Sequence, residues 1–503
     1  MLRPPRTRPE PVPAQSGGAA LTSDAFKKAL ADNRDIVFNE MAINRDKNEK
    51  ITVCFIDGMV NLKMIDDFVL KPLIQEDMLS GSNGERDIVD FIMLGAVYHG
   101  QRMLRHDFSE CMNDLLGGSV ILIFDKIQAA VTFEAKGFEK RGISESSSES
   151  VLKGSKETFI EVLRINTALV RRRIQSGDLK IHQLSIGDKT KTAVSVVWLN
   201  GVADAHIAER VKAQLLSVSI DGVVSAGQVE TLLTENKKSI FPQILYTERT
   251  DKFCACILEG RIGVIIDGMP VAFITPVDVN SFLQAPEDYS YNFVISSAIR
   301  ALRYLCAFAA LILPAFYVSV TSFHQEMIPT TLAVSIISSK QGVPFPTYME
   351  VFLMLIAFEV LLEAGLRLPH TIGPAVSIVG ALVVGQAAIA ASLVSPGVVI
   401  IIAASGITGF VIPSQDISNT IRLLRFVLVL FSIAGGLFTV TICLILIVYH
   451  MCTIEIFGVS YFSPLASNEG KNMFNDSVVI KPWNSVSDRP NNINPADVRR
   501  QGE

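Results

Sequence analysis

The stretch FVLVLFSIAGGLFTVTICLILIVYHMCTI, residues 426–454, contains no Lys, Arg, Asp or Glu and decides the class of this protein. A second uncharged stretch covers residues 368–415. Across residues 295–450, only eleven of 156 positions are Lys, Arg, Asp or Glu. A helix needs ~20 consecutive apolar residues to cross the hydrocarbon of a bilayer, whereas a helix of a soluble domain keeps a charged face. The sequence therefore predicts an integral membrane protein.

Five apolar segments are expected in this half, at about 299–320, 347–366, 374–394, 397–412 and 421–450. Arg300 and Arg303 fit a cytoplasmic start of the first segment under the positive-inside rule. The fourth segment has only sixteen residues, so a re-entrant or tilted course stays open. If it crosses, Arg422 and Arg425 mark an inner end, and the tail beyond residue 450 lies outside.

The second apolar segment carries a regularly spaced series of charged residues. Glu350 stands at its start, and Glu359, Glu363 and Arg367 follow at four-residue steps, which places those three on one helical face. Ionisable groups at membrane depth usually face a bundle interior or a water-filled path. We therefore expect these four residues, with Gln386 in the small-residue run of the third segment, to be candidates for an ion path or its gating. The alternative is an interfacial pair of Glu363 and Arg367.

The rest of the chain has the composition of a soluble domain. Of the 95 charged residues, 84 lie outside residues 295–450, and the net charge is only −5, which gives no support for nucleic-acid binding. Residues 1–22 hold five prolines and three arginines without an apolar core, which predicts a disordered tail rather than a secretory signal peptide. The polar half is therefore expected on the cytoplasmic side.

An internal repeat is visible in this polar half. Residues 51–73 and 194–216, at an offset of 143, each read as a strand, a tight turn at Asp57-Gly58 or Asn200-Gly201, and an amphipathic helix. GSVILIFD (118–125) and GRIGVIID (260–267) form a second pair at an offset of 142. The alternative is that such units resemble one another by composition alone. The repeat predicts two related α/β subdomains.

The expected organisation is a disordered tail (1–22), α/β subdomain 1 (23–138), a Ser/Glu/Lys-rich hinge or loop (139–160) and α/β subdomain 2 (161–290). An α-helical transmembrane bundle of about five segments (295–450) and a polar C-terminal tail (451–503) follow. Because the chain has no Gly-rich phosphate loop, paired catalytic carboxylates or nucleophile elbow, we expect no enzyme activity, cofactor or metal site.

Two smaller patterns have competing interpretations. Arg171, Arg172 and Arg173 could bind a phosphate or an acidic partner, but a solvated helix end is preferred because cations offset the dipole at a helix C-terminus. Cys254 and Cys256 form a C-x-C pair within a predicted strand. They are interpreted as buried free thiols rather than metal ligands.

Longer motifs follow one another in order: RINTALVRRRI (164–174), FPQILYTERTD (241–251), LEGRIGVIIDGMP (258–270), PEDYS (286–290), FHQEMIPT (323–330), VPFPTYME (343–350), EAGLRLPHTIGPAVSIVGALVVGQAA (363–388) and FGVSYFSP (457–464). Over about residues 144–464 the chain resembles the A subunit of GerA-type spore germinant receptors. We expect the PEDYS residues Glu287, Asp288 and Tyr289 to couple the subdomains to the membrane. A loop motif on the luminal side is assigned to His324, Gln325, Glu326, Pro344 and Pro346.

The resemblance implies a protein of the inner membrane of dormant spores that works with a polytopic B subunit and a lipoprotein C subunit. It also implies a homo-oligomeric, nutrient-gated channel that releases monovalent cations. Two alternatives remain: a non-conducting scaffold that organises receptor clusters, or an auxiliary paralogous channel that amplifies the signal. A secondary transporter is disfavoured because the repeat is confined to the polar half, whereas transporters usually repeat their membrane half.

Overall fold

A computed structural model describes residues 20–43, 50–75, 84–97, 101–137, 149, 153–367, 383–464, 477–482, 488–489 and 495–500. The chain forms two compact units. The first comprises Met1–Ser150, Ser155–Gln228 and Tyr246–Phe273, and the second comprises Val151–Gly154, Val229–Leu245 and Ile274–Glu503.

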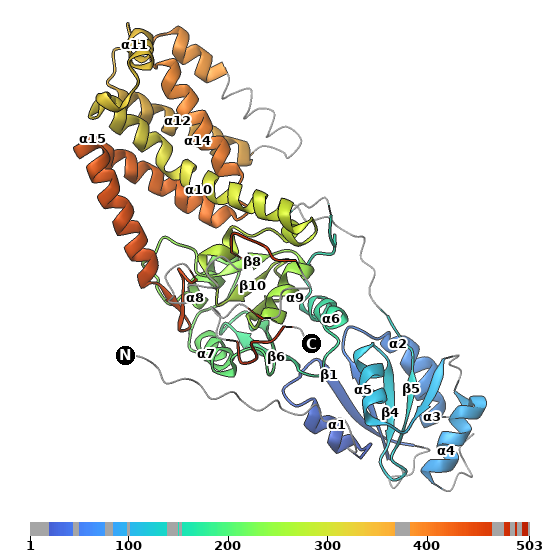
Figure 1. Cartoon of the computed structure of the whole chain (residues 1–503). Helices are drawn as coiled ribbons and strands as arrows, with labels where there is room; N and C mark the ends of the chain where they lie inside the picture. Colours follow the sequence, from blue (N-terminus) through green and yellow to red (C-terminus); the bar gives the residue numbers. More distant parts are fainter. Residues whose placement is uncertain are drawn as a thin grey trace, which may run out of the picture. The chain divides into compact units, whose positions relative to one another are not determined.

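Two five-stranded sheets share one strand order. The first sheet, drawn in blue and cyan in Figure 1, has the order β1-β2-β4-β5-β3 and contains Ile36–Ala42, Lys50–Ile56, Val120–Phe124, Ala129–Phe133 and Arg102–Arg105. The second, in green, has the order β6-β7-β9-β10-β8 and contains Leu179–Ile186, Thr192–Leu199, Ile262–Ile266, Ala272–Thr275 and Leu245–Thr247. The orders match strand for strand, in agreement with a repeat.

The paired turns of the repeat lie at corresponding places in the two sheets. Gly58 follows β2 and Gly201 follows β7, with φ of 82° and 79°. Gly118 precedes β4 and Gly260 precedes β9, with φ of 90° and 102°. Positive φ is accessible to glycine at no steric cost, which explains why the same residue recurs at both turns. The pairing that the offsets predict is thus present in the topology.

Helices cover both faces of the first sheet. The helices of the first part of the chain are α1 (Ser23–Ala29), α2 (Leu62–Ile65), α3 (Lys71–Gln75), α4 (Glu85–Phe91), α5 (Phe108–Leu116), α6 (Leu163–Arg173), α7 (Ala205–Leu216), α8 (Ala226–Leu233) and α9 (Thr250–Glu259). Val53 and Leu122 face a core that includes α2, α3 and α4, whereas Cys54 and Ile121 face α1 and α5. This alternation follows from the two-residue period of a strand.

Two smaller predictions are wrong. Cys254 and Cys256 lie on helix α9 rather than on a strand, so they do not share a face, and Cys254 is buried while Cys256 is half-buried. Arg171 is not at a solvated helix end, because its side chain is 0% exposed. The four-residue step from Thr167, which is also buried, turns Arg171 inward.

Arg171 binds the loop that leads into β1. Its Nε and Nη2 donate to the Asp35 carboxylate at 2.7 and 3.0 Å, and Nη2 also donates to Asn33 Oδ1 at 2.9 Å. Nη1 donates to the carbonyls of Leu179 and Ser176 at 2.9 and 3.3 Å. All five N–H donors of the guanidinium therefore have acceptors. The ion pair connects α6 to the first sheet.

Apolar helices dominate the second unit. They are α10 (Phe293–Ser322), α11 (Thr330–Ser339), α12 (Thr347–Arg367), a helix over residues 383–390, α14 (Pro396–Phe410) and α15 (Gln415–Thr453). Among the described residues, α10 and α15 are long and apolar enough to cross a membrane. Four of the expected segments lie within or nearly within these helices: 299–320, 347–366, 397–412 and 421–450. The fifth, 374–394, lies partly outside the described residues. Five spanning segments are therefore not confirmed.

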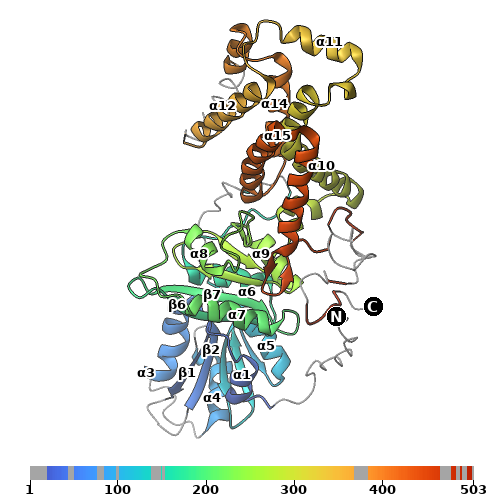
Figure 2. The same ribbon diagram turned by 90° about the vertical axis from the view of Figure 1, so that its left-hand side faces the viewer.

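Helix α15 is a hairpin of two arms rather than one rod. Its backbone leaves helical geometry at Gly435 and at Gly436, where φ is 62° and ψ is −140°. Near the start of the helix, Thr420 Oγ1 donates to the Ile240 carbonyl at 3.0 Å, and near its end His450 Nε2 lies 3.1 Å from Ser239 Oγ. Both ends thus reach the same short loop, and the views in Figures 1 and 2 show two arms that meet at an angle.

The C-terminal segment returns to the place where α10 begins. After the short strands β11 (Glu455–Ile456) and β12 (Val459–Ser460), the Tyr461 carbonyl accepts from Val279 N at 2.9 Å. The Ser463 carbonyl accepts from Asn280 Nδ2 at 3.2 Å. The conditional expectation that this tail lies outside treated α15 as one crossing, whereas these contacts place residues 461–463 beside residues 279–280, which precede α10.

Candidate functional site

A partly buried ion-pair cluster joins α12 to α15. Glu359 Oε2 accepts from Arg422 Nε at 2.8 Å and from Arg422 Nη2, and Glu359 Oε1 accepts from Arg425 Nη2 at 2.7 Å. The Arg425 side chain is only 2% exposed. Two guanidinium groups on one carboxylate leave the cluster with one net positive charge. We call Glu359, Arg422 and Arg425 the clamp.

The clamp continues into two further helices through hydroxyl and carbonyl groups. Arg425 Nη1 donates to Ser405 Oγ on α14 at 3.0 Å, and Ser405 Oγ donates to the Ala310 carbonyl on α10 at 2.9 Å. Ser405 is fully buried. Four helices are therefore connected through one carboxylate. Only Arg425 is buried among the three, so removing Glu359 would leave a buried charge without compensation, and breaking a buried pair from one side costs about 3–5 kcal/mol.

The other candidates on α12 do not join this cluster. Glu363 and Arg367 form the expected i,i+4 pair, with Glu363 Oε1 accepting from Arg367 Nη2 at 2.7 Å, but their side chains are 59% and 79% exposed. The pair therefore belongs to an exposed helix end, where such contacts are worth about 0.3–0.5 kcal/mol. Gln386 is exposed on the helix over residues 383–390.

Glu350 forms a separate buried site at the start of α12, about 13 Å along the helix from Glu359 by residue count. Its Oε2 accepts from the backbone N–H of Ser395 at 2.7 Å, and its Oε1 lies 3.2 Å from Lys340 Nζ. Ser395 is the N-cap residue of α14. The carboxylate thus satisfies one donor at a helix N-terminus, where the macrodipole favours negative charge.

The loop residues between α10 and α12 are mostly exposed. Gln325 Nε2 donates to the Thr321 carbonyl at 3.1 Å, Glu326 is exposed, and His324 is half-buried beside Gly436 at the tip of the α15 hairpin. Pro344 and Pro346 are exposed in the turn before α12. These residues are not brought together into one site.

Asp288 anchors the PEDYS motif to the start of α10. Its carboxylate accepts from Arg300 Nε at 3.1 Å and from Arg303 Nη1 and Nη2 at 2.8 Å each, and Asp288 is 2% exposed. The Tyr289 ring lies 5.4 Å from the Arg300 guanidinium carbon, within the range of a cation–π contact. Glu287 is half-buried beside them. Arg300 and Arg303, predicted as markers of membrane orientation, are therefore buried partners of this motif.

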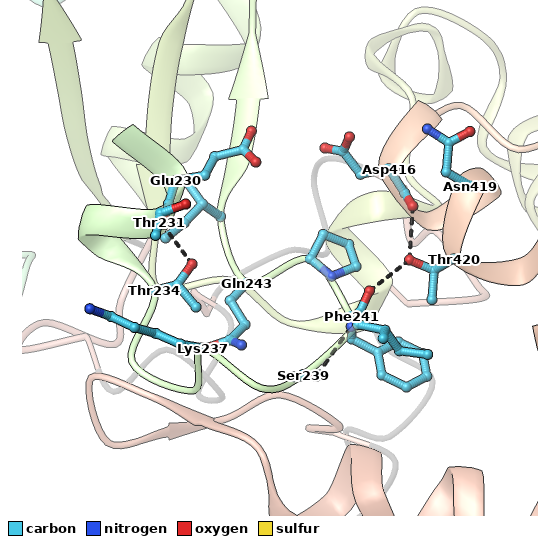
Figure 3. Close-up of a pocket in the computed structure, with 13 residues that line it drawn as sticks. Glu230, Thr231, Thr234, Lys237, Ser239, Phe241, Gln243, Asp416, Asn419 and Thr420 are labelled. Carbon is cyan, nitrogen blue, oxygen red and sulfur yellow. Dashed lines mark hydrogen bonds between the residues drawn. The ribbon is translucent and has the colours of Figure 1, made fainter. Parts of the chain in front are cut away.

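A cavity of about 340 Å³ lies in the second unit, between residues 230–244 and the first turns of α15. Glu230, on α8, and Asp416, on α15, border it, as does Lys237. Figure 3 shows both carboxyl groups facing the same space, with the Lys237 ammonium on the side away from Asp416. Burial, together with the charge of Asp416, raises the pKa of Glu230 to about 7. The cavity is thus acidic, although Glu230 is partly protonated near neutral pH.

The sequence profile described as the Bacillus/Clostridium GerA spore germination protein family matches residues 24–492. The chain belongs to this family. It is 34% identical over 478 residues to spore germination protein KA of Bacillus subtilis, which covers 95% of this chain and 87% of that protein. Spore germination protein B1 of the same organism is 34% identical over 482 residues, covering 95% and 98%. The membrane protein YfkQ of Bacillus subtilis is 36% identical over 441 residues, covering 87% and 84%.

Among solved structures, the chain is similar to the N-terminal domain of the A subunit of the Bacillus megaterium spore germinant receptor GerK3. The identity is 25% and the TM-score is 0.39, and the match covers 50% of this chain and 92% of that domain.

Sequence reasoning found Glu359 in this GerA-family chain but missed its partners. Arg422 and Arg425 were interpreted only as markers of an inner membrane end. A useful signal was present, since a lone carboxylate within an apolar helix needs a cationic partner at the same depth. The cavity residues Glu230 and Asp416 gave no comparable signal, because neither lies in a recognisable motif.

Proposed function

We propose that this chain is the A subunit of a nutrient germinant receptor in the inner membrane of a dormant spore. The observation that carries the proposal is the match to the GerA germination family over residues 24–492. The subunit works with a polytopic B subunit and a lipoprotein C subunit, and its large N-terminal region lies on the cytoplasmic (core) side.

In this proposal, the second unit assembles as a homo-oligomer and forms a nutrient-gated channel that releases monovalent cations. The apolar helices α10 and α15 support a membrane location. One copy has few helices from which to build both a water-filled path and a shell against lipid. A symmetric ring places identical helices around an axis, so each copy needs to supply only one wall of the path.

The clamp suggests how such a channel is gated. With both carboxylate oxygens bound by guanidinium groups, Glu359 is occupied and does not serve as a cation ligand in this conformation. Separation of α12 from α15 would free the carboxylate and change the charge that faces the bundle interior. Glu359 therefore acts in gating, whereas Glu350, which caps α14, acts in positioning that helix.

The proposal is tested in spores of a strain in which this chain is the sole A subunit of its class. An in-frame deletion is complemented with the parental gene, Glu359→Gln or Glu363→Gln at matched protein level, and potassium release is followed after addition of an amino-acid mixture. We expect the deletion to lower triggered release and Glu359→Gln to alter its rate or to cause release without nutrient. Glu363→Gln is the matched control, since its pair is exposed. Parental release from the Glu359→Gln spores would contradict the gating role.

Liposomes distinguish the channel from the two alternatives. Potassium-loaded liposomes that contain the chain with its B and C subunits should release the ion when the amino-acid mixture is added. If deletion impairs germination but the liposomes stay tight, the chain is a non-conducting scaffold. If the deletion only slows release that another receptor starts, the chain is an auxiliary amplifier.

A further inference from the structure

The cavity beside α15 is bordered by two carboxylates that form no ion pair among the described residues. Neither Glu230 nor Asp416 has a hydrogen-bond or ion-pair partner for its carboxyl group among the described residues, and both are half-buried. The clamp, Glu350 and Asp288 all lie in the same unit, and each of those carboxylates is paired with Lys or Arg. Two unpaired, partly desolvated carboxylates that face one partly open cavity are costly to the fold, and such groups are typical of binding sites.

The size and lining of the cavity select the kind of cation. A volume of about 340 Å³ lies at the lower end of the range for small-molecule sites and is far larger than one dehydrated metal ion. Among the described residues, no group of three or more His, Cys, Asp or Glu could hold a metal. Ile240, Pro242 and Ile244 also line the cavity and supply the apolar part of its wall. A charged head with a short hydrocarbon body matches this combination better than a bare ion.

We infer that this cavity binds a small organic ammonium ion, with its charged head between the carboxylates of Glu230 and Asp416. Three N–H donors on the head can reach both carboxylates, and the alkyl body rests on the apolar wall. The ionisable groups that line the cavity are Glu230, Asp416 and Lys237. A bound ammonium stabilises the ionised form of Glu230, so binding near neutral pH releases a proton.

Occupancy of the cavity bears on the clamp, in a step that rests on the proposed function. Asn419 lines the cavity, and its Oδ1 accepts from Arg422 Nη1 at 3.1 Å. An ammonium ion that donates to Asn419 competes with Arg422 for the same oxygen. The coupling between the cavity and the clamp is measured by ion release. Binding of the ammonium ion is measured directly on the purified chain, so a failure of the binding inference can be told apart from a failure of the proposed channel function.

Binding is tested by titration calorimetry on the purified full chain in a non-ionic detergent, with n-propylammonium chloride as the probe and 1-propanol as its neutral match. At pH 8 we expect saturable binding of the ammonium alone, weakened by ~10-fold or more in Glu230→Gln and in Asp416→Asn, since hydrogen bonds to charged groups are the strong ones. Glu209→Gln is the matched control, because Glu209 is 68% exposed on α7 and is not among the residues that line the cavity. At pH 7, heats in two buffers should show release of about half a proton in the parental chain, because the pKa of Glu230 is about 7.

Three outcomes would overturn the inference. The first is no saturable heat with propylammonium, and the second is the same affinity in the parental chain and in both cavity variants. The third is displacement of the probe by calcium or potassium at equal concentration, which would assign the site to an inorganic cation. Folding of each variant is judged by its elution volume and far-ultraviolet circular dichroism. If a variant fails to fold, the test rests on proton release by the parental chain, and the absence of proton release refutes the inference.

Discussion

Replacing Arg171 with methionine tests whether one buried ion pair holds α6 to the first sheet. Methionine keeps the length of the apolar stem but removes all five N–H donors. The Asp35 carboxylate, on a residue 3% exposed, is then left in the interior without a cation. Breaking a buried pair from one side costs about 3–5 kcal/mol. For a unit of this size, that loss lowers the melting temperature by roughly 6–20 °C.

The assay is urea unfolding of the purified full chain in detergent, followed by tryptophan fluorescence. Trp198, one of the two tryptophans, lies in β7 and is 6% exposed, so its emission reports on the second sheet. The matched control is Arg172→Met. Arg172 forms an ion pair with Glu157, and the Arg172 side chain is 37% exposed. An exposed ion pair of this kind is worth about 0–1 kcal/mol.

A double variant separates the loss of the pair from the loss of packing. Arg171→Met with Asp35→Leu removes both charges, and it should recover most of the stability, because a buried pair exchanged for apolar groups is often neutral. The reasoning is refuted if Arg171→Met is no less stable than Arg172→Met. It is also refuted if the double variant is as unstable as the single one.

Three further predictions concern single residues. Alanine at Gly58 or Gly201 should lower the free energy of unfolding by about 1–2 kcal/mol, since both glycines have positive φ. Gly58→Ala should be the more destabilising of the two, because its Cβ would lie 2.9 Å from a carbonyl oxygen of α6. Equal midpoints in urea would contradict this. Because the pKa of Glu230 is raised from 4.5 to about 7, its contribution to stability is full below pH 4.5 and is lost as the pH rises through 7. In thermal melts between pH 5 and 8, Glu230→Gln should reduce the dependence of the melting temperature on pH. An unchanged dependence would contradict this role of Glu230. Glu350→Leu should lower the amount of chain in membranes more than Glu350→Gln, which keeps an acceptor for the N-terminus of α14, and equal amounts on immunoblots would argue against the capping role.

The apolar segments of the sequence predicted the positions of α10, α12, α14 and α15, because lipid selects composition along the chain. The repeat likewise predicted corresponding turns, since glycine at positive φ is a local requirement. The partners of Glu359 could not be predicted from the sequence, because Arg422 and Arg425 lie 63 and 66 residues away along the chain. Only the packing of α12 on α15 brings them together. The break at Gly435 and Gly436 was hidden for another reason. A hydropathy window averages across a bend that contains no charge.

The return of the C-terminal segment constrains the count of membrane crossings. A chain that enters and leaves a membrane on one side has crossed it an even number of times. Val279 and Asn280, just before α10, are bonded to Tyr461 and Ser463, just after α15. Five crossings are odd, so either the two arms of α15 are counted separately or one of the shorter helices stays on one side. Cysteines introduced at Ser290 and Ser460 should therefore react with an impermeant thiol reagent from the same face of a sealed vesicle.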